Sequence, residues 1–218
     1  MKLAIFDLDN TLIAGDSDHA WGEFLVARDL VNKVEYQTKN DQFYADYCAG
    51  NLNIIAYSEF VFSFLAQHDL STLQALHRDF MATVIKPIML PKAQALIEQH
   101  RQAGDRLLII TATNRFITEP IGQAFGISEL LATEPEFIQG RYTGKVVDVP
   151  CYKEGKITRF HAWLSQQSTS FSETYFYSDS HNDLPLLCQV STPIAVNPDS
   201  ILADYAHNAG WPILDLRS

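Results

Sequence analysis

Short apolar runs, each followed by polar residues, divide the chain into predicted strands and helices. The largely apolar run at 2–6 predicts a buried strand, and the runs at 107–111 and 174–178 predict two more. Shorter strands are predicted at 193–196 and 212–214. Segments with helical periodicity lie between these runs, and strands that alternate with helices are typical of an α/β fold. The pattern therefore predicts a doubly wound, Rossmann-like, mostly parallel sheet.

A long helical block interrupts this alternation after the first strand. Residues 17 to about 84 repeat apolar positions at helical spacing, as in the stretch 57–65, which predicts about four helices. A helical block between two strands of one sheet indicates an inserted cap. We therefore expect residues 1–14 and 88–218 to form the catalytic core and residues 15–87 to form a helical cap domain.

Two local patterns predict finer details. Ser71 precedes an apolar periodic stretch and is a candidate N-cap. Residues 137–149 alternate between apolar and polar side chains around Gly140 and Gly144, which predicts a β-hairpin.

Polar residues that suit one reaction site follow three of the predicted strands. Asp7 and Asp9 follow the first strand, Thr111 ends the second, and the acidic stretch 179–183 follows the third. Lys156 opens the helix before the third strand. Ligands of α/β sheets bind at the carboxyl ends of the strands, so these groups are expected to meet there. A carboxylate, a hydroxyl, a lysine and further carboxylates together suit phosphoryl transfer through an aspartyl phosphate.

Composition and charge narrow the classes of partner. The chain has 218 residues, 47% of them hydrophobic, and a net charge of −10, which argues against nucleic acid or an anionic membrane surface as a partner. The first strand begins at residue 2, so we expect no signal peptide, and no apolar run is long enough to cross a membrane. Cys48, Cys151 and Cys188 form no C-x-x-C pair, which favours a reducing cytoplasm. The sequence predicts no oligomeric state.

The ordered motifs resemble those of the haloacid dehalogenase (HAD) superfamily. Its four motifs correspond to Asp7-Leu8-Asp9-Asn10-Thr11, to Thr111, to Lys156, and to Asp179 with Asp183. The helical insert between the first two motifs is similar to that of the phosphoserine-phosphatase-like branch. The segments 15–22, 111–114 and 154–156 resemble a bacterial group in that branch, some of whose members are histidinol-phosphate phosphatases.

The resemblance implies a nucleophile, an acid/base and a magnesium site. Asp7 would attack phosphorus, and Asp9 would protonate the leaving group and then activate water. Mg²⁺ prefers oxygen ligands. It would be held by the Asp7 carboxylate, the Asp9 backbone carbonyl and Asp179, with Asp183 as a further ligand, direct or through water.

The resemblance also implies how the phosphoryl group is bound. Thr111 would donate a hydrogen bond, and backbone N–H groups at Leu8 and Ala112 would add fixed donors. Lys156 would neutralise charge on the phosphoryl group. Lys153 lies three residues earlier, and the spacing of the following apolar positions does not separate the two lysines.

Three further residues are candidates for binding the rest of the substrate. Asp16 lies at the offset where the phosphoserine branch contacts the substrate ammonium, but it also suits a helix cap. His19 and Arg115 could contact the substrate, although a histidine in this segment is more often a packing residue and Arg115 could simply be solvated. L-Phosphoserine carries a carboxylate, and no arginine that would bind it can be placed inside the cap, whose only arginines, Arg28 and Arg78, are compatible with surface positions. The acidic entrance at Asp16 and Asp18 therefore favours histidinol phosphate.

Other functions fit the motifs less well. A sugar-phosphate mutase would need a basic cluster in the cap, and a dehalogenase needs neither a metal nor an acid at Asp9. A phosphoryl-accepting signalling domain uses a similar set of groups but lacks a large helical insert, and a catalytically inactive binding module would not need the full reactive set. The sequence therefore predicts a Mg²⁺-dependent phosphatase of a small phosphorylated metabolite.

Overall fold

A seven-stranded sheet forms the centre of the molecule in the computed structural model, which describes residues 1–218. The strand order is β4-β3-β2-β1-β5-β6-β7, and every neighbouring pair is parallel except β3 and β4. The strands are β1 (Leu3–Phe6), β2 (Arg106–Asn114), β3 (Leu130–Ile138), β4 (Arg141–Val147), β5 (Thr174–Ser178), β6 (Thr192–Val196) and β7 (Ile213–Leu214).

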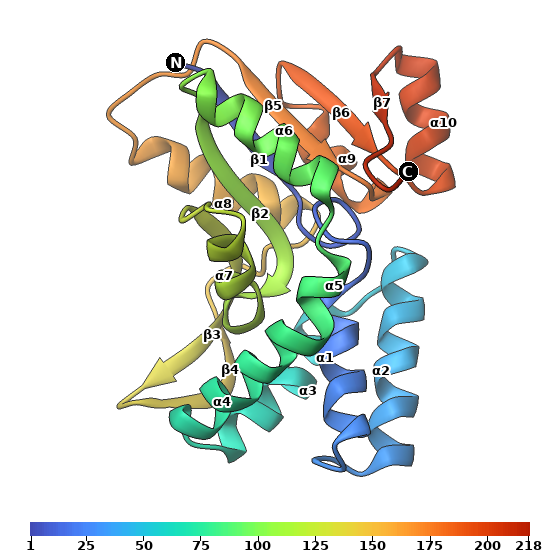
Figure 1. Ribbon diagram of the computed structural model, residues 1–218, viewed down its shortest axis with the longest axis vertical. Coiled ribbons are helices and arrows are strands. Elements are labelled where there is room, and N and C mark those ends of the chain that lie inside the picture. Colours follow the sequence, from blue (N-terminus) through green and yellow to red (C-terminus); the bar gives the residue numbers. More distant parts are fainter.

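Helices cover the sheet and form a separate layer beyond one end of it (Figure 1). The helices that follow β1 are α1 (Ser17–Ala27), α2 (Lys33–Cys48), α3 (Ile54–Gln67), α4 (Leu70–Phe80), the π-helix η1 (Met81–Ile85) and α5 (Lys86–Ile88). The helices of the sheet layer are α6 (Pro91–Gln102), α7 (Arg115–Ala124), α8 (Glu154–Ser165), the 3₁₀ turn η2 (His181–Asp183), α9 (Leu184–Leu187) and α10 (Ser200–Ala209). We call α1–α4 the cap helices.

Alternating side chains of the central strand fill two hydrophobic cores. Ala4 and Phe6 join a cluster of 32 buried residues, whereas Leu3 and Ile5 join a cluster of 13 on the other face of the sheet. Because successive side chains of a strand point to opposite faces, a strand buried on both faces must be apolar throughout. The larger cluster continues into the cap helices through Trp21 and therefore joins the two layers into one core.

The β3–β4 hairpin connects the sheet to the cap helices. It extends from the sheet toward α3 and α4, so that β4 packs beside α3 (Figure 1). Gly144 lies against this helix, where an added Cβ would be 3.6 Å from the Ala66 Cβ. The cap side of the molecule thus contains a hairpin as well as helices.

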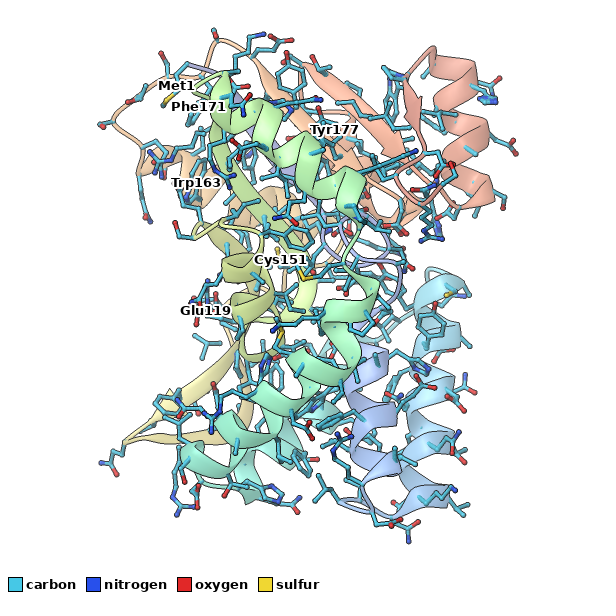
Figure 2. The ribbon with its side chains drawn as sticks, in the orientation of Figure 1. Met1, Glu119, Cys151, Trp163, Phe171 and Tyr177 are labelled. Carbon is cyan, nitrogen blue, oxygen red and sulfur yellow. The ribbon has the colours of Figure 1, made fainter.

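Two aromatic residues lie in the part of the sheet layer that is away from the cap helices, and a buried thiol lies nearer the middle of the molecule (Figure 2). Figure 2 shows Trp163 and Phe171 in this part, away from the cap helices, where their ring centroids are 6.0 Å apart. Cys151 lies nearer mid-height in the same view and is completely buried. All three cysteines are free thiols. None of the helices combines the length and the apolar character needed to cross a membrane.

The predicted α/β class, the helical insert and the hairpin are confirmed, and two local predictions are wrong. The N-cap of α4 is Asp69, whose carboxylate accepts from the Thr72 amide at 2.8 Å, and Ser71 lies within the first turn. The first strand of the hairpin begins at Leu130, seven residues before the predicted start, and it pairs with β2 before its antiparallel pairing with β4 begins at Glu134.

Candidate active site

The first motif forms a tight turn at the carboxyl end of β1. The Asp7 amide still donates to the Tyr177 carbonyl of β5, and the Leu12 amide then closes the turn onto the Leu8 carbonyl at 2.8 Å. Asn10 adopts a left-handed conformation with a φ of 56°. The Leu8 and Asp9 amides donate no hydrogen bond within the protein. Two free N–H groups beside a carboxylate can bind phosphoryl oxygens, as the sequence predicted for Leu8.

Lys156 joins two of the predicted carboxylates. Its Nζ lies 2.7 Å from Asp7 Oδ1 and 2.7 Å from Asp183 Oδ1, and all three side chains are almost completely buried. Burial raises the pKa of Asp7, and the Lys156 ammonium opposes this rise. Ser178 also donates to Asp183 at 2.7 Å, so Asp183 positions Lys156 beside the Asp7 carboxylate.

A glycine allows the helix that carries Lys156 to approach the preceding loop. Gly155 lies in the first turn of α8, and an added Cβ would be 2.0 Å from the Pro150 carbonyl oxygen, which no real contact permits. Only glycine fits here without moving the backbone.

We expect Gly155→Ala to lower the free energy of unfolding by about 1–3 kcal/mol, because the loop or the helix must shift. It should also reduce kcat, since the shift moves Lys156. Urea unfolding and steady-state kinetics measure the two effects. His161→Ala, at an exposed site on the same helix, is a suitable control. Unchanged stability and kcat in Gly155→Ala would contradict this prediction.

Asp9 is held by a backbone amide and two hydroxyls. The Ser17 amide donates to Oδ1 at 2.6 Å, while Thr113 and Thr111 donate to Oδ2 at 2.9 and 3.4 Å. Burial raises the pKa of Asp9, and the hydrogen bonds from Ser17 and Thr113 oppose the rise. A raised pKa suits an acid/base, because the carboxyl group then holds its proton at a higher pH than a free aspartate does.

Thr113 was not among the predicted site residues, although it is closer to Asp9 than Thr111 is. The two hydroxyls lie two residues apart on β2, and alternate residues of a strand share a face. This spacing was the signal that could have identified Thr113. Ala112, between them, lines the same pocket.

The donors around Asp7 fit a hard divalent cation. No group of three or more His, Cys, Asp and Glu side chains forms a ready-made metal cage. Mg²⁺ needs only one or two carboxylates, because it keeps several waters. The Asp9 carbonyl oxygen accepts no hydrogen bond, and Asp179 lies nearby with one oxygen accepting from Thr11 at 3.1 Å. Burial and the charges of Asp7 and Asp183 raise the pKa of Asp179 well above its usual value, and a cation would relieve this repulsion.

Side chains of the cap helices close a pocket over Asp7 and Asp9. The free space is about 30 Å³, which is too small for a phosphate ester, so the cap helices must move to admit one. Neither arginine nor lysine lines the pocket. Its cap-side lining consists of acidic, histidine, aromatic and aliphatic residues: Asp16, Asp18, His19, Phe43, Tyr44, Tyr47, Leu52, Ile54 and Tyr57.

Of the three residues predicted to bind the rest of the substrate, Asp16 and His19 line the pocket and Arg115 does not. Asp16 lines the pocket and also caps α1, accepting from the Asp18 and His19 amides at 3.0 and 2.8 Å. The His19 ring stacks on Tyr44 with centroids 4.6 Å apart.

Arg115 does not line this pocket, and its contact with the substrate stays a prediction. Its guanidinium makes a bidentate pair with Glu134 on β3 and donates to the Leu130 carbonyl at 2.9 Å. The strand that brings these acceptors to Arg115 was the one that the sequence pattern did not reveal.

Lys153 contacts the cap rather than the catalytic carboxylates. Its Nζ donates to the Gly50 carbonyl just beyond α2, and Asn182 donates to the Tyr47 carbonyl at 3.1 Å. The carbonyl end of a helix carries partial negative charge, which favours a cation there. The Lys153 backbone has a φ of 48°, an uncommon conformation for a non-glycine residue. Lys153 and Asn182 therefore hold α2 closed over the pocket.

We expect Lys153→Ala to lower kcat/KM by about 10-fold, because the loss of a charged hydrogen bond weakens closure by about 1.5 kcal/mol. Steady-state kinetics and unfolding curves should show reduced kcat/KM with little loss of stability. Lys145→Ala, at an exposed site on β4, is a matched control. An unchanged kcat/KM in Lys153→Ala would show that this contact does not support closure.

Comparisons with known proteins identify relatives of this chain. Residues 4–187 match the family described as haloacid dehalogenase-like hydrolase. The chain is 47% identical to a histidinol-phosphatase of Neisseria meningitidis serogroup C, and the alignment covers 99% of both chains. It is 29% identical to a phosphoserine phosphatase of Mycobacterium tuberculosis, over 98% of this chain and 70% of that protein.

Solved structures show the same fold. A protein of unknown function from Bordetella pertussis Tohama I superimposes with a TM-score of 0.93 at 42% identity, covering 99% of this chain and 98% of that one. A substrate-bound phosphoserine phosphatase superimposes with a TM-score of 0.71 at 15% identity, over 98% and 92% of the two chains. At that identity the likeness concerns the fold alone.

Proposed function

The chain belongs to the haloacid dehalogenase-like hydrolase family and is a phosphatase, and we propose that it hydrolyses histidinol phosphate through an aspartyl-phosphate intermediate. The observation that carries the proposal is the pairing of Asp7 with Lys156 beside Asp9, at the base of a pocket whose lining includes four aspartates and neither arginine nor lysine. We also propose that residues 15–87 act as a mobile cap on a core of residues 1–14 and 88–218, in a cytoplasmic enzyme.

In the first proposed step, Asp7 displaces the substrate alcohol. A carboxylate oxygen of Asp7 forms a bond to phosphorus while the bond from phosphorus to the ester oxygen breaks, and Asp9 gives its proton to that oxygen. Lys156, the Thr111 hydroxyl and the free amide of Leu8 stabilise the negative charge on the phosphoryl oxygens.

In the second proposed step, water attacks the phosphorus of the aspartyl phosphate. Asp9, now ionised, takes a proton from the water, and the Asp7 carboxylate is released together with inorganic phosphate. The hydroxyl of Thr113 and the amide of Ser17 keep the Asp9 carboxyl oriented in both steps.

The proposed cofactor is Mg²⁺, which when bound supplies positive charge that lowers the repulsion between a carboxylate and a phosphate dianion. Asp7, the Asp9 carbonyl and Asp179 would hold it. Asp183 is engaged by Lys156 and Ser178, so its contribution to the metal site would be indirect.

Charge in the pocket favours histidinol phosphate over L-phosphoserine. Phosphoserine carries a carboxylate that needs a cationic partner when buried, and no arginine or lysine lines the pocket. Histidinol phosphate carries an amine and an imidazole, both of which suit acidic walls. The similarity to phosphoserine phosphatases nevertheless makes phosphoserine the second candidate.

The test is phosphate release with Mg²⁺ from histidinol phosphate, L-phosphoserine and an aryl phosphate. We expect kcat/KM for histidinol phosphate on the order of 10⁴ M⁻¹s⁻¹ or higher, with little activity on phosphoserine. Chelation of the metal should abolish turnover. The reverse preference would assign phosphoserine as the substrate. Activity on the aryl phosphate alone would support the phosphatase mechanism and exclude both histidinol phosphate and L-phosphoserine as substrates.

Asp9→Asn should impair breakdown of the intermediate, because asparagine can neither protonate the leaving group nor deprotonate water. General acid–base catalysis contributes about 10²–10⁴-fold, so kcat should fall by that factor while substrate binding changes little. Acid quenching after labelling should detect a longer-lived phosphoenzyme. Near-normal turnover would reject the acid/base role of Asp9.

A further inference from the structure

Asp18 is a buried carboxylate with no cationic partner in the protein. It lies in the first turn of α1, is 7% exposed and lines the pocket above Asp7 and Asp9. No lysine, arginine or histidine makes a salt bridge with it. A buried carboxylate without a cationic partner either keeps its proton or is matched by a group of a ligand, and such groups in a cleft are candidates for binding.

Helix capping does not account for Asp18. The N-cap of α1 is Asp16, whose Oδ1 already accepts from the amides of Asp18 and His19. Both side chains that contact Asp18 are neutral: Asn114 donates to Oδ1 at 3.3 Å, and the Tyr57 hydroxyl also faces the carboxyl group. The two acids at the pocket entrance therefore differ: one is engaged by the backbone, and the other is available to a ligand.

Asn114 fixes the orientation of Asp18 without neutralising it. Asn114 is the N-cap of α7, where its Oδ1 accepts from the Ile117 amide at 3.2 Å. This contact turns the amide so that its NH₂ group faces Asp18. Because the Asn114 amide is neutral, it holds the Asp18 carboxylate in place without balancing its negative charge. A polar group of a ligand in the pocket can interact with that charge.

Aromatic rings on the cap helices form the wall beside Asp18. Tyr57 and Phe43 both line the pocket, and their ring centroids are 5.2 Å apart. Burial raises the pKa of Asp18 well above its usual value, as do the charges of Asp16 and Asp9, whereas the Tyr57 hydroxyl opposes the rise. A carboxylate beside flat aromatic surfaces suits a planar ring with an N–H group, which can stack and donate at once.

We propose that Asp18 is a specificity-determining residue that accepts a hydrogen bond from a planar nitrogen base, of the imidazole type, in the leaving group of the substrate. The inference rests on the proposed function, because it assumes that the leaving alcohol extends from Asp9 toward the cap helices. Asp16, with one oxygen engaged as a cap, remains beside Asp9 for a group closer to the ester.

The test compares four phosphate esters with the intact enzyme and Mg²⁺. Histidinol phosphate carries an amine and an imidazole, 2-(imidazol-4-yl)ethyl phosphate only the ring, phosphoethanolamine only the amine, and 4-nitrophenyl phosphate neither. In Asp18→Asn, the ratio of kcat/KM for the imidazolyl ester to that for 4-nitrophenyl phosphate should fall by about 10–100-fold, since a charged hydrogen bond is lost. The loss should be mainly in KM.

Asp16→Asn is the matched variant, and its imidazolyl-to-aryl ratio should fall less. An equal fall for all four esters in Asp18→Asn would overturn the inference in favour of a structural role. A selective fall for phosphoethanolamine would overturn it in favour of an ammonium site.

Two measurements keep the inference testable if Asp18→Asn does not fold. The wild-type enzyme must prefer the imidazolyl ester to phosphoethanolamine, and calorimetry must show that 4-methylimidazole binds to the wild type. Equal kcat/KM values for the two esters, or no binding of 4-methylimidazole, would overturn the inference. If the wild type cleaves 4-nitrophenyl phosphate but does not prefer the imidazolyl ester to phosphoethanolamine, the proposed role of Asp18 is excluded and the proposed phosphatase activity is not. If it cleaves none of the esters, the proposed function itself falls.

Discussion

Asp7→Asn should abolish turnover, with kcat falling by roughly 10⁴-fold or more, as expected when a covalent nucleophile is removed. Asparagine has nearly the same shape but no ionisable oxygen to attack phosphorus. Neither a burst of released alcohol nor a labelled phosphoenzyme should be detected. Rapid-quench kinetics with histidinol phosphate, and with an aryl phosphate if that is the better substrate, measures both.

The same substitution should not destabilise the fold. Burial raises the pKa of Asp7, and Asp183 and Asp9 add repulsion, so a neutral side chain relieves an unfavourable charge. Lys156 keeps its contact with Asp183. We expect the free energy of unfolding to be equal to or higher than that of the wild type. A stable Asp7→Asn variant that still forms a phosphoenzyme would reject Asp7 as the nucleophile.

Lys156→Met should lower both stability and activity. Removing the ammonium leaves Asp7 and Asp183 buried without their shared counter-charge, and breaking a buried ion pair in this way costs about 3–5 kcal/mol. Losing a donor to the phosphoryl group should lower kcat by about 10²–10³-fold. Urea unfolding and steady-state kinetics measure the two losses separately.

A second substitution distinguishes the ion pair from the phosphate contact. Adding Asp183→Asn to Lys156→Met removes one of the two uncompensated carboxylates, so it should recover part of the lost stability. It should not restore kcat, because the phosphoryl group still lacks its cation. If stability does not recover, the loss in Lys156→Met comes from packing rather than from charge.

The meeting point of the proposed catalytic carboxylates could be predicted because strand ends have a fixed place in a parallel sheet. Phe6 pairs with Ile109 on one side and with Tyr177 on the other, so the residues that follow these strands must meet. The apolar runs alone indicated this, since each is buried on both faces. Asp7, Asp9, Thr111 and the stretch 179–183 therefore came together without any knowledge of side-chain contacts.

The choice between the two lysines depended on backbone detail. Lys153 and Lys156 lie three residues apart at the start of one helix, and the sequence pattern fits both. The close approach of Gly155 to the Pro150 carbonyl sets the position of α8, and this turns Lys156 inward and leaves Lys153 to contact Gly50. The hydrophobic periodicity of the sequence contains no information about this close contact between Gly155 and Pro150.

The sequence by itself determined the fold class, the inserted helices and the order of the catalytic groups, because these follow from hydrophobic periodicity and from strand ends. Only the tertiary structure showed that Arg115 pairs with Glu134, and that Asp18 lies buried beside the neutral donor Asn114. Both outcomes depend on contacts between segments far apart in the chain. Whether a charged side chain is neutralised, solvated or left for a ligand is decided by such long-range neighbours, which a local pattern does not contain.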